Sequence, residues 1–393
     1  MKKIIIFCLT VTMFFSSLSA GNFLTSRIFD FTVGADVALS NNVTALSNIL
    51  VKDLVIDLNK INERVPDSGA NLSMKFNPDL QMRLSLGKLK FGVKTGIEMQ
   101  GQFTISKDLF EFLGKGNQIG DEIEVGVDCD FDAFYFLDLA MGWHSSKLKI
   151  NVVPSLFQPI ISANGDLATL KVLNDDAGKV SLGLTSNYNI YTPLDLQNID
   201  VNDLSTSAIG FDLAGSVEFP LNSRTNIKIA ARVPIIPGTL TKKMVYTNTI
   251  YYETSLETMD NPEQVSESSF ESGIDTEYKI NRPLKLIGYI DYSILGGLLD
   301  LNGGLGLGCR HPFVSNAKIY PEYYLAGTLN LINLFKVSLS MEYTDQVFIN
   351  QLTADFNIRF FELYTGISLQ SSSFWQSFTT AGFGAFVYLT FGF

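Results

Sequence analysis

Apolar and polar residues alternate along most of this chain, and the alternation is clearest at its C-terminal end. Every second position there is apolar, namely Phe383, Ala385, Val387, Leu389, Phe391 and Phe393. A period of two places neighbouring side chains on opposite faces of a β-strand. A wholly apolar face suits a strand of a closed barrel, where that face can contact lipid. The alternative, the closing strand of a soluble β-sandwich, is disfavoured because the pattern recurs along the whole chain.

Long alternating segments of this kind predict a series of membrane-crossing strands. They include residues 29–39, 89–105, 123–131, 148–152, 209–219, 227–233, 335–343 and 352–360. The segment 89–105 is longer than a tilted strand needs to cross a bilayer, so it should extend beyond the membrane on one side. We therefore predict an all-β fold, a transmembrane antiparallel β-barrel of about 14 strands (about 12 to 16) in residues 67–393. A polar stretch, 257–269, predicts a loop outside the membrane.

The period changes from two to about 3.6 shortly after the first alternating segment. The apolar residues with helical spacing are Val43, Leu46, Leu50, Leu54, Leu58 and Ile61. Asn42 can cap this helix, and Val65 followed by Pro66 ends the pattern. Charged residues interrupt the run, so the helix is amphipathic. Residues 21–66 are therefore predicted to form an N-terminal strand and a hatch helix, which either plugs the lumen, lies beneath the periplasmic mouth or lies on the membrane surface.

Four prolines stand at the ends of good strand patterns: Pro154, Pro159, Pro234 and Pro237. Proline removes a donor from the hydrogen-bond ladder and is tolerated at an edge, a bulge or a strand end. In a closed wall these positions predict either a rim or a lateral gap.

The N-terminus predicts export. Two lysines precede an apolar run at residues 4–15, and small residues follow up to Ala20, which is typical of a secretory signal peptide spanning residues 1–20. Beyond it no apolar stretch is long enough for a transmembrane helix. An exported chain with 46% apolar residues and 30 Phe therefore favours the bacterial outer membrane. With 40 acidic against 29 basic residues, the charge argues against nucleic acid as a partner.

Charged residues on the polar faces predict a ladder along the lumen wall. Its members are Lys88, Lys90, Lys94, Glu122, Glu124, Asp128, Asp130, Asp132, Lys147 and Lys149. If neighbouring strands pair in order, the acidic row lies between two lysine rows and forms cross-strand ion pairs. A divalent cation site or a cation-selective pore is the alternative. The row fails as an EF-hand because Ala133 replaces the required glycine and Leu139 the bidentate glutamate, and we assign no metal.

Catalytic chemistry finds little support. His144 and His311 are the two histidines, and the adjacent pair His144 and Ser145 would point to opposite faces of a strand. We assign no catalytic residue and no cofactor. Cys129 and Cys309 remain after removal of the leader and either pair or stay as two thiols.

Two resemblances add to this interpretation. The C-terminal strand resembles that of Gram-negative outer-membrane barrels, which implies that Leu389, Phe391 and Phe393 are recognised by the barrel insertion machinery. Residues 210–221, 231–240, 361–371 and 382–393 resemble a family of spirochaete outer-membrane barrels of unknown function. That family is distantly similar to the FadL-type long-chain fatty-acid transporters, and residues 34–46 are similar to the start of their hatch. The Asn-Pro-Ala of that hatch is missing here, so ligand residues are not carried over.

The resemblance implies an outer-membrane channel for uptake of small, hydrophobic molecules such as long-chain fatty acids, with outer-membrane lipid around it. Two alternatives are a general porin for polar solutes and a surface-exposed adhesin or structural protein.

Overall fold

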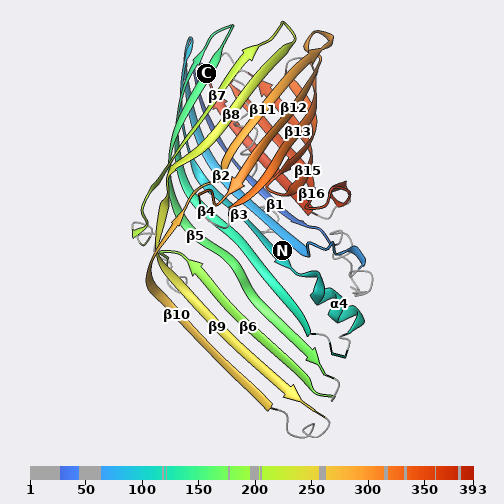
Figure 1. The fold of residues 1–393 in the computed structure, drawn as a ribbon. Helices are drawn as coiled ribbons and strands as arrows, with labels where there is room; N and C mark the ends of the chain where they lie inside the picture. Colours follow the sequence, from blue (N-terminus) through green and yellow to red (C-terminus); the bar gives the residue numbers. More distant parts are fainter. Residues whose placement is uncertain are drawn as a thin grey trace.

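The fold is a closed antiparallel β-barrel with a sheet extending from one side (Figure 1). The computed structural model describes residues 27–43, 63–116, 119–120, 122–175, 178–194, 203, 206–255, 263–313, 317–331, 334–358, 360–378 and 382–393. The strands are β1 (Phe29–Asn41), β2 (Ala70–Leu86), β3 (Leu89–Ile105), β4 (Glu122–His144), β5 (Lys149–Asn174), β6 (Val180–Tyr191), β7 (Gly210–Pro220), β8 (Thr225–Ile236), β9 (Gly238–Thr254), β10 (Glu263–Ile280), β11 (Leu284–Ile294), β12 (Leu299–Arg310), β13 (Lys318–Leu331), β14 (Phe335–Thr344), β15 (Val347–Ile358), β16 (Phe361–Ser371) and β17 (Gly382–Gly392). The helical elements are α4 (Lys107–Lys115), η2 (Leu295–Gly297) and η3 (Gln376–Phe378). None of the helices in these ranges could span a membrane.

The wall closes between the first and the last strand. The ring of paired strands runs β1, β2, β3, β4, β5, β7, β8, β11, β12, β13, β14, β15, β16 and β17, and β17 returns to β1. The prediction placed the strand at residues 29–39 in an N-terminal segment, 21–66, apart from the barrel at 67–393; for this strand that is corrected, because β1 is a wall strand. It has a hydrogen-bonded neighbour on each edge, and its polar face turns Asp30 and Asp36 into the buried interior.

A three-stranded extension of β6, β9 and β10 leaves the ring, and Figure 1 shows it at the lower end of the barrel. It branches from β5, whose first part pairs with β7 (Lys149 to Phe157) and whose second part pairs with β6 (Ser162 to Asn174). The described residues thus hold seventeen strands, more than the predicted number. Residues 263–269 belong to β10, although the sequence predicted a loop there.

The branch point explains two of the four prolines. Pro159 lies on β5 between its two partners, and Pro237 separates β8 from β9. Gly210 and Gly238 lie beside them, and a Cβ on either would overlap Phe157 or Pro159. The prolines therefore mark where the wall divides, and the two glycines allow the strands to approach closely there.

The predicted division of side chains between two faces is confirmed. On β3, Leu89, Phe91 and Val93 are exposed, whereas Lys94, Glu98 and Gln102 are buried. The barrel is thus apolar outside and polar inside, the reverse of a soluble β-sandwich, whose core is apolar.

The two ends of the barrel differ. We call the end where Phe29 and Phe393 meet the terminal end, and the opposite end the distal end. Short turns join the strands at the terminal end, for instance at residues 87–88, and the longer connections lie at the distal end. Of the predicted hatch helix, Leu46, Leu50, Leu54, Leu58 and Ile61 lie outside the described residues. Asn42, near the end of β1, hydrogen-bonds Gly69 and Asn71 at the distal end.

Candidate functional site

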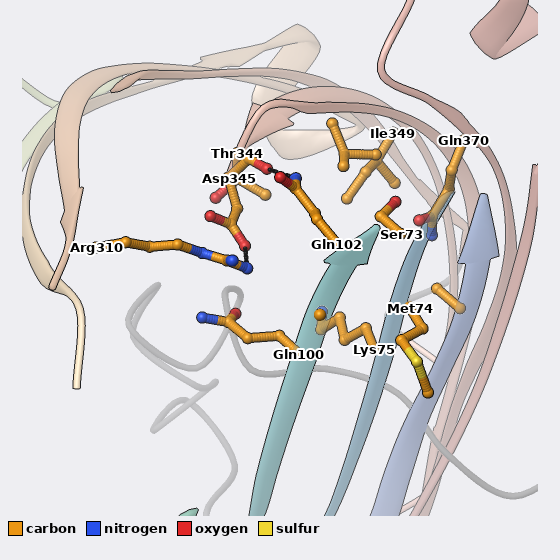
Figure 2. A pocket seen from close by; sticks show the side chains of 13 residues that line it. Ser73, Met74, Lys75, Gln100, Gln102, Arg310, Thr344, Asp345, Ile349 and Gln370 are labelled. Carbon is orange, nitrogen blue, oxygen red and sulfur yellow. Dashed lines mark hydrogen bonds and ion pairs between the residues drawn. The ribbon is translucent and has the colours of Figure 1, made fainter. Parts of the chain in front are cut away.

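A pocket opens inside the distal end of the barrel. Figure 2 shows its polar side chains, which come from strands on several sides of the lumen. They are Ser73, Lys75, Gln100, Gln102, Arg310, Thr344, Asp345 and Gln370. Ala38, Val347 and Ile349 supply an apolar wall. The pocket therefore combines hydrogen-bonding groups with a small apolar surface, as ligand sites do.

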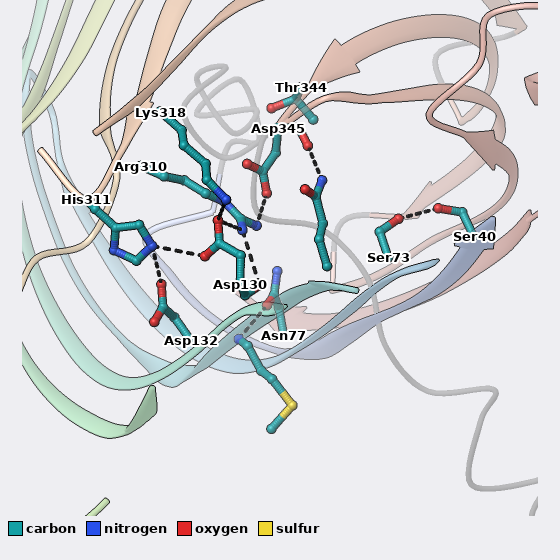
Figure 3. A network of polar contacts seen from close by, with 12 residues as sticks. Ser40, Ser73, Asn77, Asp130, Asp132, Arg310, His311, Lys318, Thr344 and Asp345 are labelled. Carbon is teal, nitrogen blue, oxygen red and sulfur yellow. Dashed lines mark hydrogen bonds and ion pairs between the residues drawn. The ribbon is translucent and has the colours of Figure 1, made fainter. Parts of the chain in front are cut away.

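A cluster of ion pairs lies beside this pocket and is drawn in Figure 3. We call it the distal cluster: Asp130, Asp132, Arg310, His311, Lys318 and Asp345. The Asp130 carboxylate accepts hydrogen bonds from His311 Nε2 at 2.9 Å and Lys318 Nζ at 3.0 Å, and Arg310 lies 3.2 Å from it. Arg310 also donates to Asp345. Because four wall strands separate β4 from β12 in the ring, these contacts join distant parts of the wall.

The turn between β14 and β15 directs Asp345 into the lumen. Asp345 and Gln346 have φ angles of 51° and 66°, the left-handed conformation that a two-residue hairpin turn requires. Gln102 on β3 donates to the Asp345 carbonyl at 2.9 Å, across the lumen. The strained turn is thus held in place from the opposite wall.

His311 follows the last residue of β12, where the wall strand ends. Burial lowers the pKa of His311, but the hydrogen bond to Asp130 and the charges of Asp132 and Asp130 outweigh burial, so the pKa lies above its ordinary value. The protonated imidazole therefore helps to join β12 to β4.

We expect the distal cluster to loosen as the pH rises. Folding raises the pKa of His311, so the stabilisation by its protonated imidazole is fully present below about pH 6.5. This stabilisation is lost as the pH rises through the pKa of His311 in the folded protein. Arg310, whose pKa is raised by Asp345 and Asp130, keeps its charge over this range, so the loss is partial. Single-channel conductance in planar bilayers between about pH 5.5 and pH 9 should rise with pH in the natural protein and change less in His311→Gln. A rise of equal size in His311→Gln would assign the effect to another group.

A second cluster of charged side chains lies on the inner side of the wall near the middle of the barrel, and we call it the central cluster: Glu98, Asp138, Asp212, Arg232 and Arg282. Arg282, 0% exposed, lies in the break between β10 and β11. Its guanidinium donates to Glu98 at 2.7 Å, to Asp212 at 3.2 Å and to Ser155 at 2.9 Å. The Phe136 ring lies 5.0 Å away, within the apolar cluster of Phe134, Phe136, Phe157 and Ile280. Side chains from β3 and β7 thus meet inside the barrel at the branch point.

Three side chains of the distal cluster also have the spacing of metal ligands. Ligand atoms of Asp130, Asp132 and His311 lie within 4.8 Å of one another. Arg310 and Lys318, however, already contact the second oxygen of Asp130. The cationic neighbours would repel a metal ion, so we interpret the group as an ion-pair network.

The predicted charged ladder forms ion pairs, but with other partners than expected. Its contacts are Lys94 to Asp79 at 3.1 Å, Lys149 to Glu218 at 2.5 Å, Glu124 to Lys171 at 3.1 Å, Asp128 to Lys318 at 3.8 Å, and those of Asp130 and Asp132 in the distal cluster. The strand register places Lys90 opposite Gly142 and Lys94 opposite Asp138. The acidic half of β4, with Asp128, Asp130 and Asp132, therefore lies at the distal end, away from Lys90 and Lys94 on β3. Lys88 and Lys147 lie in turns at the terminal end, and the Glu122 side chain lies outside the described residues.

Other predicted residues are placed as follows. Phe391 and Phe393 are exposed at the end of β17, and recognition of Leu389, Phe391 and Phe393 by the insertion machinery stays a prediction. Cys129 and Cys309 are free thiols. Sequence analysis missed Arg282, Arg310 and Asp345. An arginine beside a proline in a strand break was the available signal for Arg282.

The comparisons with known proteins concern the fold. No family model and no curated protein matches the sequence. Three solved structures are similar over 98% of this chain. The TodX deltaS2S3 mutant monoaromatic hydrocarbon channel has a TM-score of 0.50 at 9% identity, with 96% of its chain covered. The P. putida toluene transporter TodX has a TM-score of 0.49 at 8% identity, with 93% of its chain covered. The Ralstonia pickettii toluene transporter TbuX has a TM-score of 0.46 at 9% identity, with 95% of its chain covered.

At such identities the similarity shows the arrangement of the strands. The described chain is a closed antiparallel barrel of the kind that the TodX channel forms. The predicted resemblance to transporter barrels thus holds at the level of the fold, whereas the spirochaete family stays a prediction.

Proposed function

We propose that this protein is a transporter of the bacterial outer membrane for the uptake of small, hydrophobic molecules. One observation carries the proposal: ion pairs cross the lumen at two heights, and a pocket with an apolar wall lies at the distal end. An open porin would instead keep a water-filled lumen. Long-chain fatty acids are one candidate substrate, implied by the resemblance to FadL-type transporters.

The orientation of the barrel supports uptake from the outside. Outer-membrane barrels have short periplasmic turns and longer extracellular connections. By this rule the distal end, with the pocket and the extension, faces the exterior. On β10 the exposed Glu267, Ser268 and Glu271 cover both faces. The extension therefore stands outside the hydrocarbon of the bilayer.

Conductance and uptake together test the proposal. In planar bilayers we expect a small conductance, because the central and distal clusters obstruct the lumen. Bacterial cells that produce the protein should take up labelled toluene or palmitate faster than cells without it, while uptake of a labelled sugar should be unchanged. A large, steady conductance with faster sugar uptake would identify a general porin. No effect on any solute would favour an adhesin or a structural protein.

A further inference from the structure

Within the described residues, the turns at the terminal end of the barrel carry basic side chains and no carboxylate. Four connections at this end are described in full, namely residues 87–88, 145–148, 221–224 and 295–298. Their charged residues are Lys88, Lys147 and Arg224, all exposed, and none of the three side chains forms an ion pair with a described residue. The three turns follow one another around the wall, because β3 pairs with β4 and β5 pairs with β7. We call Lys88, Lys147 and Arg224 the basic rim.

Local hydrogen bonds order two of these turns. Ser145 Oγ accepts from the backbone N–H of Lys147 at 3.3 Å and from that of Leu148 at 3.1 Å. Asn222 Oδ1 accepts from the backbone N–H of Arg224 at 2.8 Å. Serine and asparagine side chains stabilise turns in this way. The fold therefore sets the place of both cations at the edge of the wall.

The distal half of the molecule has a different charge balance. Carboxylates pair there with cations of the surface: Lys107 with Asp67 at 2.6 Å, Lys171 with Glu124 at 3.1 Å and Lys179 with Glu253 at 2.7 Å. The exposed Glu267 and Glu271 on β10 add further negative charge. An anionic group is therefore attracted to the terminal end more than to the distal end.

Exposed apolar side chains border the basic rim on the outer face of the wall. Leu86 and Leu89 flank the turn that holds Lys88 and are 52% and 48% exposed. Trp143, 42% exposed, lies beside Leu89 on β4. Since a strand advances about 3.3 Å per residue, the rim lies within about 10 Å of this apolar row. That is the height of the lipid headgroups, to which lysine and arginine side chains extend.

We infer that the basic rim binds the phosphate groups of anionic phospholipids, such as phosphatidylglycerol, in the leaflet around the terminal end. A lipid phosphate has the opposite charge to the rim and lies at its height. An acidic soluble protein would match the charge, but it would not need the apolar border. The inference goes beyond the proposed function, because it rests on the membrane barrel and not on transport.

Fluorescence quenching by brominated lipids tests the inference, because one of the two tryptophans of the chain lies beside the rim. Trp375→Phe leaves Trp143 as the reporter in the full mature protein. This protein is placed in phosphatidylcholine vesicles that contain equal fractions of brominated phosphatidylglycerol or brominated phosphatidylcholine. The association constant at Trp143 should be about fivefold higher for phosphatidylglycerol, the effect of one cation near an anionic surface. The preference should decrease at high salt, which screens exposed charges.

Paired variants in the same Trp375→Phe background locate the site. Lys88→Gln combined with Lys147→Gln should bring the two lipids to nearly equal association at Trp143. Lys115→Gln combined with Lys179→Gln is the matched control, since it removes the same charge near the distal end. This control should keep the preference for phosphatidylglycerol. The gel-shift assay for barrels checks that both variants are folded.

The outcomes separate this inference from the proposed function. Equal quenching by the two lipids before the lysines are changed would overturn the inference and favour an acidic protein as the partner. An unchanged preference in Lys88→Gln with Lys147→Gln would also overturn it. Absence of quenching by either lipid would contradict the membrane barrel together with the rim. A lipid preference in a protein that takes up no solute would contradict transport and support the rim.

Discussion

Arg282→Ala should destabilise the barrel more than any other single substitution in the lumen, by about 3–5 kcal/mol. The guanidinium is completely buried, and its loss leaves Glu98, Asp138 and Asp212 without their shared counter-charge. The variant should unfold at a lower temperature in the gel-shift assay for barrels. Because the side chain also obstructs the lumen at the branch point, single-channel conductance should increase.

A double-mutant cycle makes this prediction sharper. If uncompensated charge is the cause, Arg282→Ala combined with Glu98→Gln should be less destabilised than the sum of the two single variants. Lys279→Ala is the matched control, since Lys279 is exposed and forms an ion pair with the exposed Glu277; its effect should stay within about 0.5 kcal/mol. Strict additivity of Arg282→Ala and Glu98→Gln would mean that lost packing against Phe136, and not charge, dominates.

Leu339→Arg should destabilise the protein in a lipid bilayer by about 2–4 kcal/mol. Leu339 lies in the middle of β14 with its side chain turned outward and 67% exposed. An outward position at this height contacts hydrocarbon if the barrel spans a membrane, and a guanidinium is costly there. Unfolding by guanidinium chloride in lipid vesicles measures the difference from the natural protein.

The extension supplies the control for this second prediction. Phe270 on β10 is also exposed, at 52%, but lies among charged and hydroxyl residues. Phe270→Arg should therefore change the free energy of unfolding by less than about 0.5 kcal/mol. Equal effects at the two positions, or a natural protein that stays monodisperse without detergent, would remove the basis for a membrane barrel.

The alternation of apolar and polar residues made the barrel predictable, because the pattern within each strand shows which of its faces is apolar and which is polar. The outward residues Leu89 and Phe91 and the buried Lys94 and Glu98 could be assigned to faces from sequence alone. The number of strands was harder to predict. Nothing in the local pattern distinguishes a strand that continues through Pro237 from one that changes partners there, as β8 and β9 do. Likewise the alternation of residues 29–39 does not reveal that β1 pairs with β17.

The candidate site could be predicted less well than the fold. The sequence marked Asp130 and Asp132 as lumen charges, and both lie in the distal cluster. Their partners Arg310 and His311 are some 180 residues away along the chain. Pairing of neighbouring strands in order would have joined them to lysines instead.

The sequence by itself determined that this protein is a strand-built barrel with an apolar exterior and a charged interior. The physical reason is local, since a period of two fixes which residues share a face. Only the tertiary structure decided which charges meet, where the wall branches and which side chains line the pocket. Those features depend on strand register and on closure of the ring, which bring together residues that no local pattern relates.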